Sequence, residues 1–185
     1  MNLYGAGGMP SDTPKEHDIH IAGGEPLLVR HVQPGDEPRL AEMLAQASPE
    51  DIRFRCFGAI KDFPHTLAAR LTRIDPARDA TLIAVASEGE PGAIMGVVHV
   101  ICERVHPEMA EYDIMIRPDH KGHGLGYALM REILNEARRR GLKAVEGYIL
   151  RDNKTMLFMA REHGFRPVAE EDDVIVMRAE LQEER

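Results

Sequence analysis

Three strand-like segments, separated only by short turns, constrain the fold of this chain more than any other feature. They are residues 80–87 (ATLIAVAS), 93–105 (AIMGVVHVICERV) and 109–117 (MAEYDIMIR). All three are rich in branched apolar side chains, which favour strands, and the turns between them contain glycine or proline. Because turns this short can join only antiparallel neighbours, the segments predict an antiparallel meander.

Helical and strand patterns flank the meander on both sides. Before it we expect a strand at 26–33 and an interrupted helical stretch over 34–73, with Asp36 as a helix cap and Ser48 and Asp51 as a capping box. After it we expect helices over 124–140 and 153–163 and strands over 143–150, 165–168 and 174–178, with an acidic, solvated turn at 170–173. The pattern predicts an α+β domain with a mixed, mostly antiparallel, twisted sheet and helices on both faces.

Composition excludes several classes of protein. The 23 basic residues are outnumbered by 31 acidic ones, giving a net charge of −8 that argues against a nucleic-acid partner. No apolar run is long enough to span a membrane, and two cysteines are too few for a disulfide framework, so we expect a cytoplasmic protein. We divide the chain into a flexible lead (1–24), one domain (25–180) and a tail (181–185).

A glycine-rich turn follows the third strand of the meander. Gly122, Gly124 and Gly126 alternate with other residues just before an amphipathic helix. Glycines allow a ligand to approach the backbone, and the free amides at a helix start bind anions such as a pyrophosphate. The spacing differs from that of a dinucleotide fingerprint or a Walker loop. A turn with no ligand is the alternative interpretation.

The order of these elements resembles the GNAT superfamily of acyl-CoA N-acyltransferases. The similarity covers residues 26–179 and includes the K-G-x-G-x-G turn and an N-x-x-M helix that ends in Gly-Phe. Two longer motifs, SPEDIRFRCFG (48–58) and AEYDIMIRPDHKGHGLG (110–126), resemble the acetyltransferase domain of bacterial Pat-type protein lysine acetyltransferases. The resemblance implies the GNAT fold, with acetyl-CoA as acyl donor and no metal.

The resemblance also implies which residues contact the coenzyme. The turn would bind the pyrophosphate through backbone amides, and the strand before it, Tyr112 to Ile116, would splay so that its amides reach the pantetheine and the thioester. The implied contacts are Ile114, Met115, Ile116, Lys121, Gly122, His123, Gly124, Leu125, Gly126, Asn153 and Met156. Lys121 stands where the superfamily commonly has Gln or Arg, and it would act as a point charge toward phosphate. With Arg117, His120 and His123 it predicts a basic coenzyme cleft in an otherwise acidic surface.

The chemistry requires a base, because a free lysine amine has a pKa of about 10.4 and is protonated at neutral pH. In Pat-type domains the base is a glutamate at the start of the strand before the glycine turn, and Glu111 matches it. Asp113 lies on the same strand face and is the second candidate. Ala160 occupies the position where many members have a tyrosine that protonates the leaving thiolate, so the thiolate would leave as an anion or take its proton from water.

Other candidate residues favour structural roles. His99, Cys102 and His106 are the candidate metal ligands. Because His99 and Cys102 point to opposite faces of the strand, we do not expect the three side chains to converge on a metal. Cys56 is expected in the core. Arg53 and Arg55 would position substrate or form surface salt bridges.

Three functional hypotheses remain. The first is acetylation of lysine side chains in proteins, with acyl-CoA synthetases among the candidate acceptors. The second is acetylation of a small amine or amino acid, and the third is a non-catalytic acyl-CoA sensor. The sequence indicates neither the acceptor nor the oligomeric state.

Overall fold

A computed structural model describes residues 16–22, 24, 26–56 and 62–181 of the chain. In chain order the strands are β1 His17–Ile19, β2 Leu27–His31, β3 Asp79–Ala86, β4 Ile94–Cys102, β5 Met109–Ile116, β6 Ala144–Leu150, β7 Arg166–Glu171 and β8 Val174–Glu180. The helices are α1 Glu37–Ala45, α2 Pro49–Cys56, α3 Phe63–Thr72, α4 Leu125–Arg139 and α5 Lys154–Glu162, with short 3₁₀ turns at Pro34–Asp36 and Pro118–His120.

The strands form one mixed sheet in the order β1-β2-β3-β4-β5-β6-β8-β7. Every neighbouring pair is antiparallel except β5 and β6, which are parallel. The predicted meander is confirmed as β3, β4 and β5, and the α+β class with a mostly antiparallel sheet is confirmed as well.

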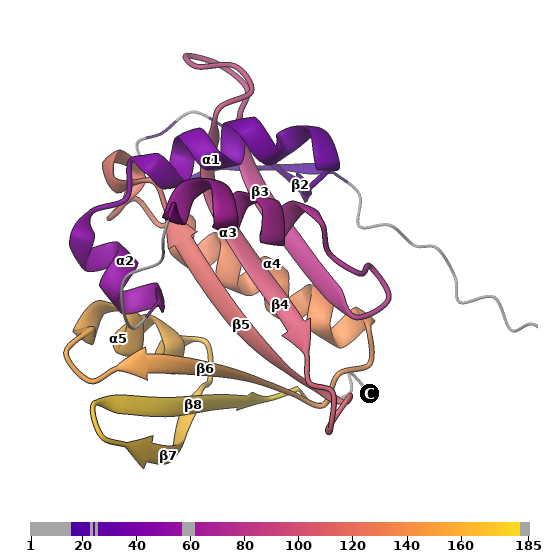
Figure 1. Ribbon diagram of the computed structural model, residues 1–185, viewed down its shortest axis with the longest axis vertical. Helices are drawn as coiled ribbons and strands as arrows, with labels where there is room; N and C mark the ends of the chain where they lie inside the picture. The colour runs from indigo at the N-terminus through magenta and orange to yellow at the C-terminus, as the bar shows by residue number, and fades with distance from the viewer. Residues whose placement is uncertain (1–15, 23, 25, 57–61, 182–185) are drawn as a thin grey trace, which may run out of the picture.

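Helices cover both faces of the sheet (Figure 1). α4 and α5 pack on one face, where the larger apolar cluster includes Leu129, Met130 and Phe165. α1 and α3 pack on the other face in a second cluster that includes Leu44 and Leu67. The alternation of side chains along β4 and β5 supplies both clusters at once, which is why these two strands lie at the centre of the molecule.

The structure corrects three local predictions. Residues 17–19, placed by the sequence in a flexible lead, form β1 and pair with β2. Asp36 is the N-cap residue of α1 as predicted, but its side chain makes no capping bond: the buried carboxylate accepts from the Gln33 amide and pairs with Arg30 at 2.7 and 2.8 Å. Of the predicted acidic turn, residues 170 and 171 belong to β7, and the turn itself is shorter.

The predicted capping box at the start of α2 is confirmed. The Asp51 amide donates to Ser48 Oγ at 3.1 Å, and the Ser48 amide donates back to the Asp51 carboxylate at 3.2 Å. The box fixes the first turn of α2, a helix that borders the cavity described next.

Candidate active site

β5 and β6 separate soon after they begin to run side by side. Their pairing covers three residues of each strand, Met109–Glu111 opposite Ala144–Glu146. Farther along, β5 stays paired with β4 and β6 stays paired with β8, but the two strands no longer pair with one another. A gap therefore opens within the sheet itself, and one edge of each strand faces it.

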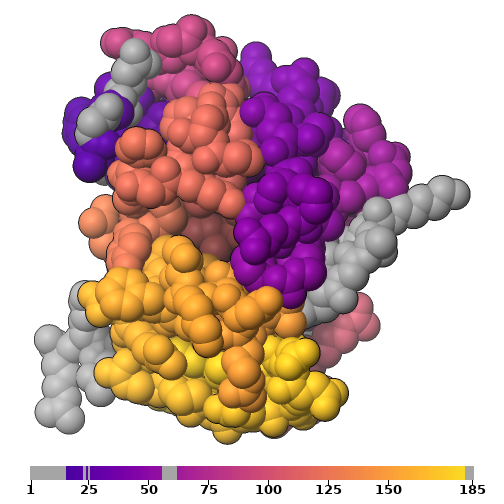
Figure 2. Space-filling view, turned by 90° about the vertical axis from the view of Figure 1, so that its left-hand side faces the viewer, coloured from indigo at the N-terminus to yellow at the C-terminus, as the bar shows by residue number. Residues whose placement is uncertain are grey.

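A cavity of about 660 Å³ occupies this gap. Its lining comes from α2, β5, the glycine turn, β6 and α5, so it reaches both faces of the sheet. In Figure 2 the recess lies between the orange surface of the turn and α4, the yellow-orange surface of α5, and the purple surface of α2. Segments far apart in the sequence therefore enclose one site.

The glycine turn gives the cavity an anion-binding character. Gly122 and Gly124 have positive φ angles of 78° and 90°, which a residue with a side chain adopts only with strain. Gly124 is the N-cap of α4 and supplies no side-chain cap to the first-turn amides. These amides, with the positive end of the helix dipole, can bind an anion. Gly126 also lines the cavity, and a Cβ there would lie 3.2 Å from Met159 Sδ.

The cationic side chains near the turn are engaged with carboxylates. Lys121 Nζ pairs with Asp51 of α2. Arg117 is buried and bonds to Glu90 at 2.9 Å and to Asp119 at 2.8 Å. The sequence predicted that these side chains, with His120 and His123, make the cleft basic; the structure shows Lys121 and Arg117 paired with carboxylates, so their charges are partly compensated.

The ion pair between Lys121 and Asp51 also shifts the pKa of Asp51. Burial alone would raise the pKa of Asp51, but bonds from Lys121 and Ser48 outweigh it and lower the pKa. Asp51 therefore stays ionised and joins the glycine turn to the start of α2. Two of the predicted contacts in the turn, His123 and Leu125, are not among the residues that line the cavity: His123 is exposed, and the Leu125 side chain is fully buried in the core.

The backbone of β5 turns alternate amides toward the gap. The Arg117 amide donates to the Met95 carbonyl of the β4 segment at 2.9 Å. Because main-chain groups alternate in direction along an antiparallel strand, the amides of Ile114 and Ile116 point away from β4 and toward the gap. The Met115 amide points the other way, and its side chain is buried against α1 and α3. Of the three predicted contacts, which all line the cavity, Ile114 and Ile116 thus turn their amides toward the gap.

Glu111 is the last residue of β5 that pairs with β6, and it lines the cavity. Within the described part of the chain, its carboxylate makes no hydrogen bond or ion pair. Glu111 is exposed at the cavity, but partial desolvation of its carboxylate still raises its pKa above the ordinary value. The negative charges of Asp113, Glu103 and Glu146 raise it further, whereas Arg55 opposes them. A carboxylate with a raised pKa holds a proton more tightly and is therefore a stronger base.

Asp113 lies two residues along the same face of β5 and is held by α2. Two of the three nitrogens of the Arg55 guanidinium, Nε and Nη2, donate to its carboxylate, with an Nε–Oδ1 distance of 2.8 Å. The Arg55 side chain is nearly buried, so this bidentate pair is more than a surface contact. Arg53 pairs with Asp152 at 2.7 Å on the exposed side of α2. Both arginines are therefore in salt bridges, one of the two roles that the sequence left open.

The start of α5 closes the cavity. The Asn153 side chain accepts from the Met156 amide at 3.1 Å, which makes Asn153 the N-cap, and both residues line the cavity. Ala160 is fully buried one turn farther on and has no polar group to offer.

A family model described as "Acetyltransferase (GNAT) family" matches residues 46–165. The chain belongs to this GNAT acetyltransferase family. It is 27% identical over 152 residues to Acetyltransferase PA5475 of Pseudomonas aeruginosa, an alignment that covers 81% of this chain and 80% of that protein.

Solved structures share the fold of this GNAT acetyltransferase. The GNAT domain of S. lividans PAT superposes with a TM-score of 0.80 at 23% identity, covering 90% of this chain and 97% of that one. The spermidine N-acetyltransferase from Vibrio cholerae, solved with CoA and spermine, superposes with a TM-score of 0.67 at 20% identity, covering 85% and 96%. The GNAT fold predicted from the sequence is thus confirmed.

Several residues that line the cavity of this acetyltransferase were not predicted from its sequence. Gly147 and Tyr148 come from β6, and Phe54 comes from α2. Gly147 carried a signal, because an isolated glycine inside a strand often marks a close approach of other groups. The other two lie in ordinary strand and helix patterns, which do not indicate which element will face a cavity.

The remaining candidates lie outside this site. No three His, Cys, Asp or Glu side chains gather as a metal would require in the ranges that the structure describes. His99 is buried and its Nδ1 lies 3.1 Å from Thr81 Oγ1. The side chain of Cys56, predicted to be in the core, lies outside the described part of the chain. No described helix combines the length and the apolar character that crossing a membrane needs.

Proposed function

We propose that this acetyltransferase transfers the acetyl group of acetyl-CoA to the ε-amino group of lysine residues in proteins, with Glu111 as the general base. The observation that carries the proposal is the position of Glu111: an unpaired carboxylate of raised pKa at the point where β5 and β6 separate. The solved relative with CoA and spermine supports a coenzyme site in this fold.

The coenzyme would lie across the gap, with its phosphates at the glycine turn. The amides after Gly124 would bind the pyrophosphate, and the outward amides of Ile114 and Ile116 would bond to the pantetheine arm and the thioester carbonyl. Asn153 and Met156 would contact the coenzyme from α5. Lys121 would add a charge to a phosphate after leaving Asp51.

Glu111 would prepare the nucleophile. A lysine amine with a pKa of about 10.4 must lose a proton before it can attack the thioester carbon. Glu111 would take this proton directly or through one water. Asp113, fixed by Arg55, would act as a positioning residue whose negative charge strengthens Glu111 as a base.

The acceptor side of the cavity suits a cation. Glu50 of α2 lines it together with Glu111 and Asp113, while the nearby Lys121 and Arg55 are paired. A protein lysine and a polyamine share this positive charge, and the likeness to a spermidine acetyltransferase keeps a small polyamine as the second candidate. The long motifs shared with Pat-type domains favour the protein acceptor.

The test is acetyl transfer from radiolabelled acetyl-CoA to a panel of proteins, which includes acyl-CoA synthetases, and to small amines, which include spermidine. We expect labelled protein, and we expect Glu111→Gln to lower kcat by a factor on the order of 10² to 10⁴ while acetyl-CoA still binds. The matched control is Glu88→Gln in the exposed β3–β4 turn, which should leave transfer unchanged.

Each contrary outcome removes one part of the proposal. Labelling of small amines alone would replace the protein acceptor with the second candidate. Normal transfer by Glu111→Gln would remove Glu111 as the base. Acetyl-CoA binding without transfer to any amine would indicate a sensor.

A further inference from the structure

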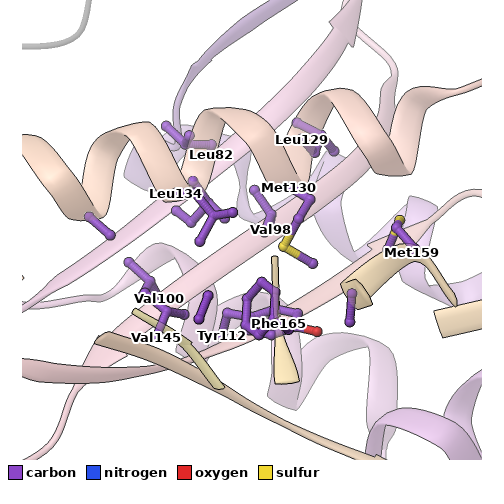
Figure 3. Packing of buried hydrophobic residues seen from close by; sticks show 14 of the residues in the cluster. Leu82, Val98, Val100, Tyr112, Leu129, Met130, Leu134, Val145, Met159 and Phe165 are labelled. Carbon is purple, nitrogen blue, oxygen red and sulfur yellow. The ribbon is translucent and has the colours of Figure 1, made fainter. Parts of the chain in front are cut away.

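Two tyrosines near the place where β5 and β6 separate have opposite surroundings. Tyr112 of β5 is only 4% exposed and packs against Phe165 in the core, with ring centroids 5.2 Å apart (Figure 3). Tyr148 of β6 is 42% exposed and lines the cavity, although β6 lies inside the sheet between β5 and β8. Tyr112 is therefore a core residue, whereas a ligand in the cavity can reach the ring of Tyr148.

The strand register places Tyr148 on the same face of the sheet as the proposed base. Glu111 is the register partner of Glu146, and Tyr148 lies two residues farther along β6, so it shares that face. Asp113 holds the equivalent position on β5, where the strands have already separated. The cluster under α1 and α3 takes residues from β3, β4 and β5, and none of its described members comes from β6. Tyr148 therefore borders the widening gap without a covering helix of that layer.

The surroundings of Tyr148 are acidic. Its pKa is raised by partial burial first and then by the negative charges of four carboxylates, those of Glu146, Glu111, Glu103 and Glu171. Arg178 bonds to Glu146 at 2.6 Å and compensates it in part. Carboxylates around an exposed ring attract an ammonium group and repel a carboxylate ligand.

Helix α2 adds a second aromatic side chain to the cavity. Phe54 is half-buried and lines the cavity, and the Arg53 guanidinium carbon lies 4.6 Å from the centre of its ring. Glu50 of the same helix also lines the cavity, and Arg55 is held by Asp113. The acceptor side thus combines apolar ring surface with carboxylates, which suits a ligand that has an apolar stem and a cationic end.

We propose that Tyr148 determines acceptor specificity: its ring packs along the methylene chain of an unbranched primary amine and directs the nitrogen toward Glu111. The inference rests on the proposed function, in which an amine accepts the acetyl group. Lysine side chains bury their methylene stems along apolar surfaces while the charged end stays in a polar environment. Phe54 contributes further apolar surface from α2.

This role of Tyr148 defines the chemical class of the acceptor. The amine is carried at the end of several methylene groups, as is the ε-amine of lysine. The α-amine of a free amino acid has no such stem, and its carboxylate would lie among the carboxylates around Tyr148. We therefore expect transfer to the ε-amine and not to the α-amine.

The first test combines variants of Tyr148 with acceptors that differ in stem length. Two peptides are compared, identical except that one carries lysine and the other ornithine, which is one methylene shorter. The wild type should prefer lysine in kcat/KM about fourfold, the value of one buried methylene group. Tyr148→Thr, which removes the ring but keeps a residue that favours strands, should raise KM for the lysine peptide about fivefold or more, change kcat less than KM, and bring the preference near one. Tyr148→Phe should keep the preference.

The matched control is Phe158→Ala on α5. Phe158 is an aromatic residue that is 59% exposed and does not line the cavity, so its removal should leave both KM and the lysine preference unchanged. The same lysine preference in Tyr148→Thr as in the wild type would overturn the proposal, and so would its loss in Tyr148→Phe.

The second test needs no acetyl transfer. The lysine peptide is titrated into the CoA-bound protein, and its Kd is followed by nuclear magnetic resonance shifts. We expect Tyr148→Thr to raise this Kd by about the same factor as KM, and Tyr148→Phe to leave it unchanged. An equal Kd in the wild type and Tyr148→Thr, or no binding to the wild type, overturns the inference.

The inference and the proposed function can fail separately. Labelled protein together with an unchanged KM in Tyr148→Thr would reject the inference and keep the protein acceptor. Labelling of spermidine alone, with a KM for spermidine that rises in Tyr148→Thr, would reject the protein acceptor and support the role of Tyr148.

Discussion

The surroundings of Glu111 raise its pKa. Its pKa is raised by burial first and then by Asp113, Glu103 and Glu146, and Arg55 works against the rise. Glu146 is itself bonded to Arg178 at 2.6 Å, so part of its charge is compensated. Asp113, which raises the pKa of Glu111, and Arg55, which lowers it, therefore form a pair whose removal should move that pKa in opposite directions.

We predict opposite shifts of the acidic limb of the kcat/KM profile. The base works when deprotonated, so activity rises with pH through the pKa of Glu111, at a higher pH than for an ordinary carboxylate. Asp113→Asn removes a negative charge and leaves Arg55 free, and both effects should move the limb to lower pH. Arg55→Met removes the opposing positive charge and should move it to higher pH. Shifts in the same direction would show that neither charge acts on Glu111.

A second prediction concerns Lys121, whose charge is shared with Asp51. Asp51→Asn should release the lysine toward a phosphate and remove a negative charge, so the Kd for acetyl-CoA should fall severalfold by calorimetry. In the double variant with Lys121→Met this gain should disappear. A gain that persists without the lysine would mean that the loss of the Asp51 charge alone is responsible.

Single residues were predictable where they are tied to a local pattern. The Ser48–Asp51 capping box and the N-cap role of Asn153 depend on residues three positions apart, and both are present. The Lys121–Asp51 and Arg55–Asp113 pairs join residues far apart in the chain, so the sequence showed the charges without their partners. For this reason the predicted basic cleft stays a prediction, with two of its four cations now seen in ion pairs.

At the scale of elements, the close contact between β5 and β6 depends on Gly147, which has no side chain. The Tyr112 ring occupies the space that a Cβ on Gly147 would need. Gly147 is therefore selected by packing across the separation of the two strands and not by its backbone angles, since its φ is not among the positive ones.

We predict that Gly147→Ala destabilises the fold by about 1–3 kcal/mol, the usual cost of overpacking, as measured by denaturant unfolding. Because the ring would be displaced toward the cavity, the Kd for acetyl-CoA should also rise. Gly35→Ala is the matched control, as no atom lies within 4 Å of its added Cβ, and it should be close to neutral. Equal effects of the two variants would contradict the packing argument.

Elements were predictable where short turns or strong periodicity define them. The meander became β3, β4 and β5, and the helix after the glycine turn became α4. β1 was missed because its three residues, His-Asp-Ile, have no strand pattern of their own and pair only because β2 offers an edge. The place where β5 and β6 separate was implied by the family resemblance, whereas its register could come only from the structure.

For the whole molecule, the net charge of −8 has to be compatible with an anionic coenzyme. In the proposed site, the backbone amides at the start of α4 would bind the phosphates, so no field of free basic side chains is required. The carboxylates on the acceptor side are then free to act on a cation.

We predict that the acceptor side discriminates by charge. Two peptides with the same central lysine, one flanked by Arg and the other by Asp, should differ in KM, with the Arg-flanked peptide lower. The difference should shrink as ionic strength rises from about 0.01 M to about 0.15 M, because the Debye length falls from roughly 30 Å to roughly 8 Å. A difference that is insensitive to salt would point to direct contacts in place of the overall charge.

The two parts of the sheet, β1–β5 and β6–β8, are joined in the sheet by three residue pairs between β5 and β6. Beyond these pairs, each described strand pairs with neighbours in its own part of the sheet. The first carries the glycine turn and Glu111, and the second supplies the facing wall. We expect the sequences of related proteins to reflect this junction. The residues of β6 and α5 should vary among them more than the residues of β5 that line the cavity.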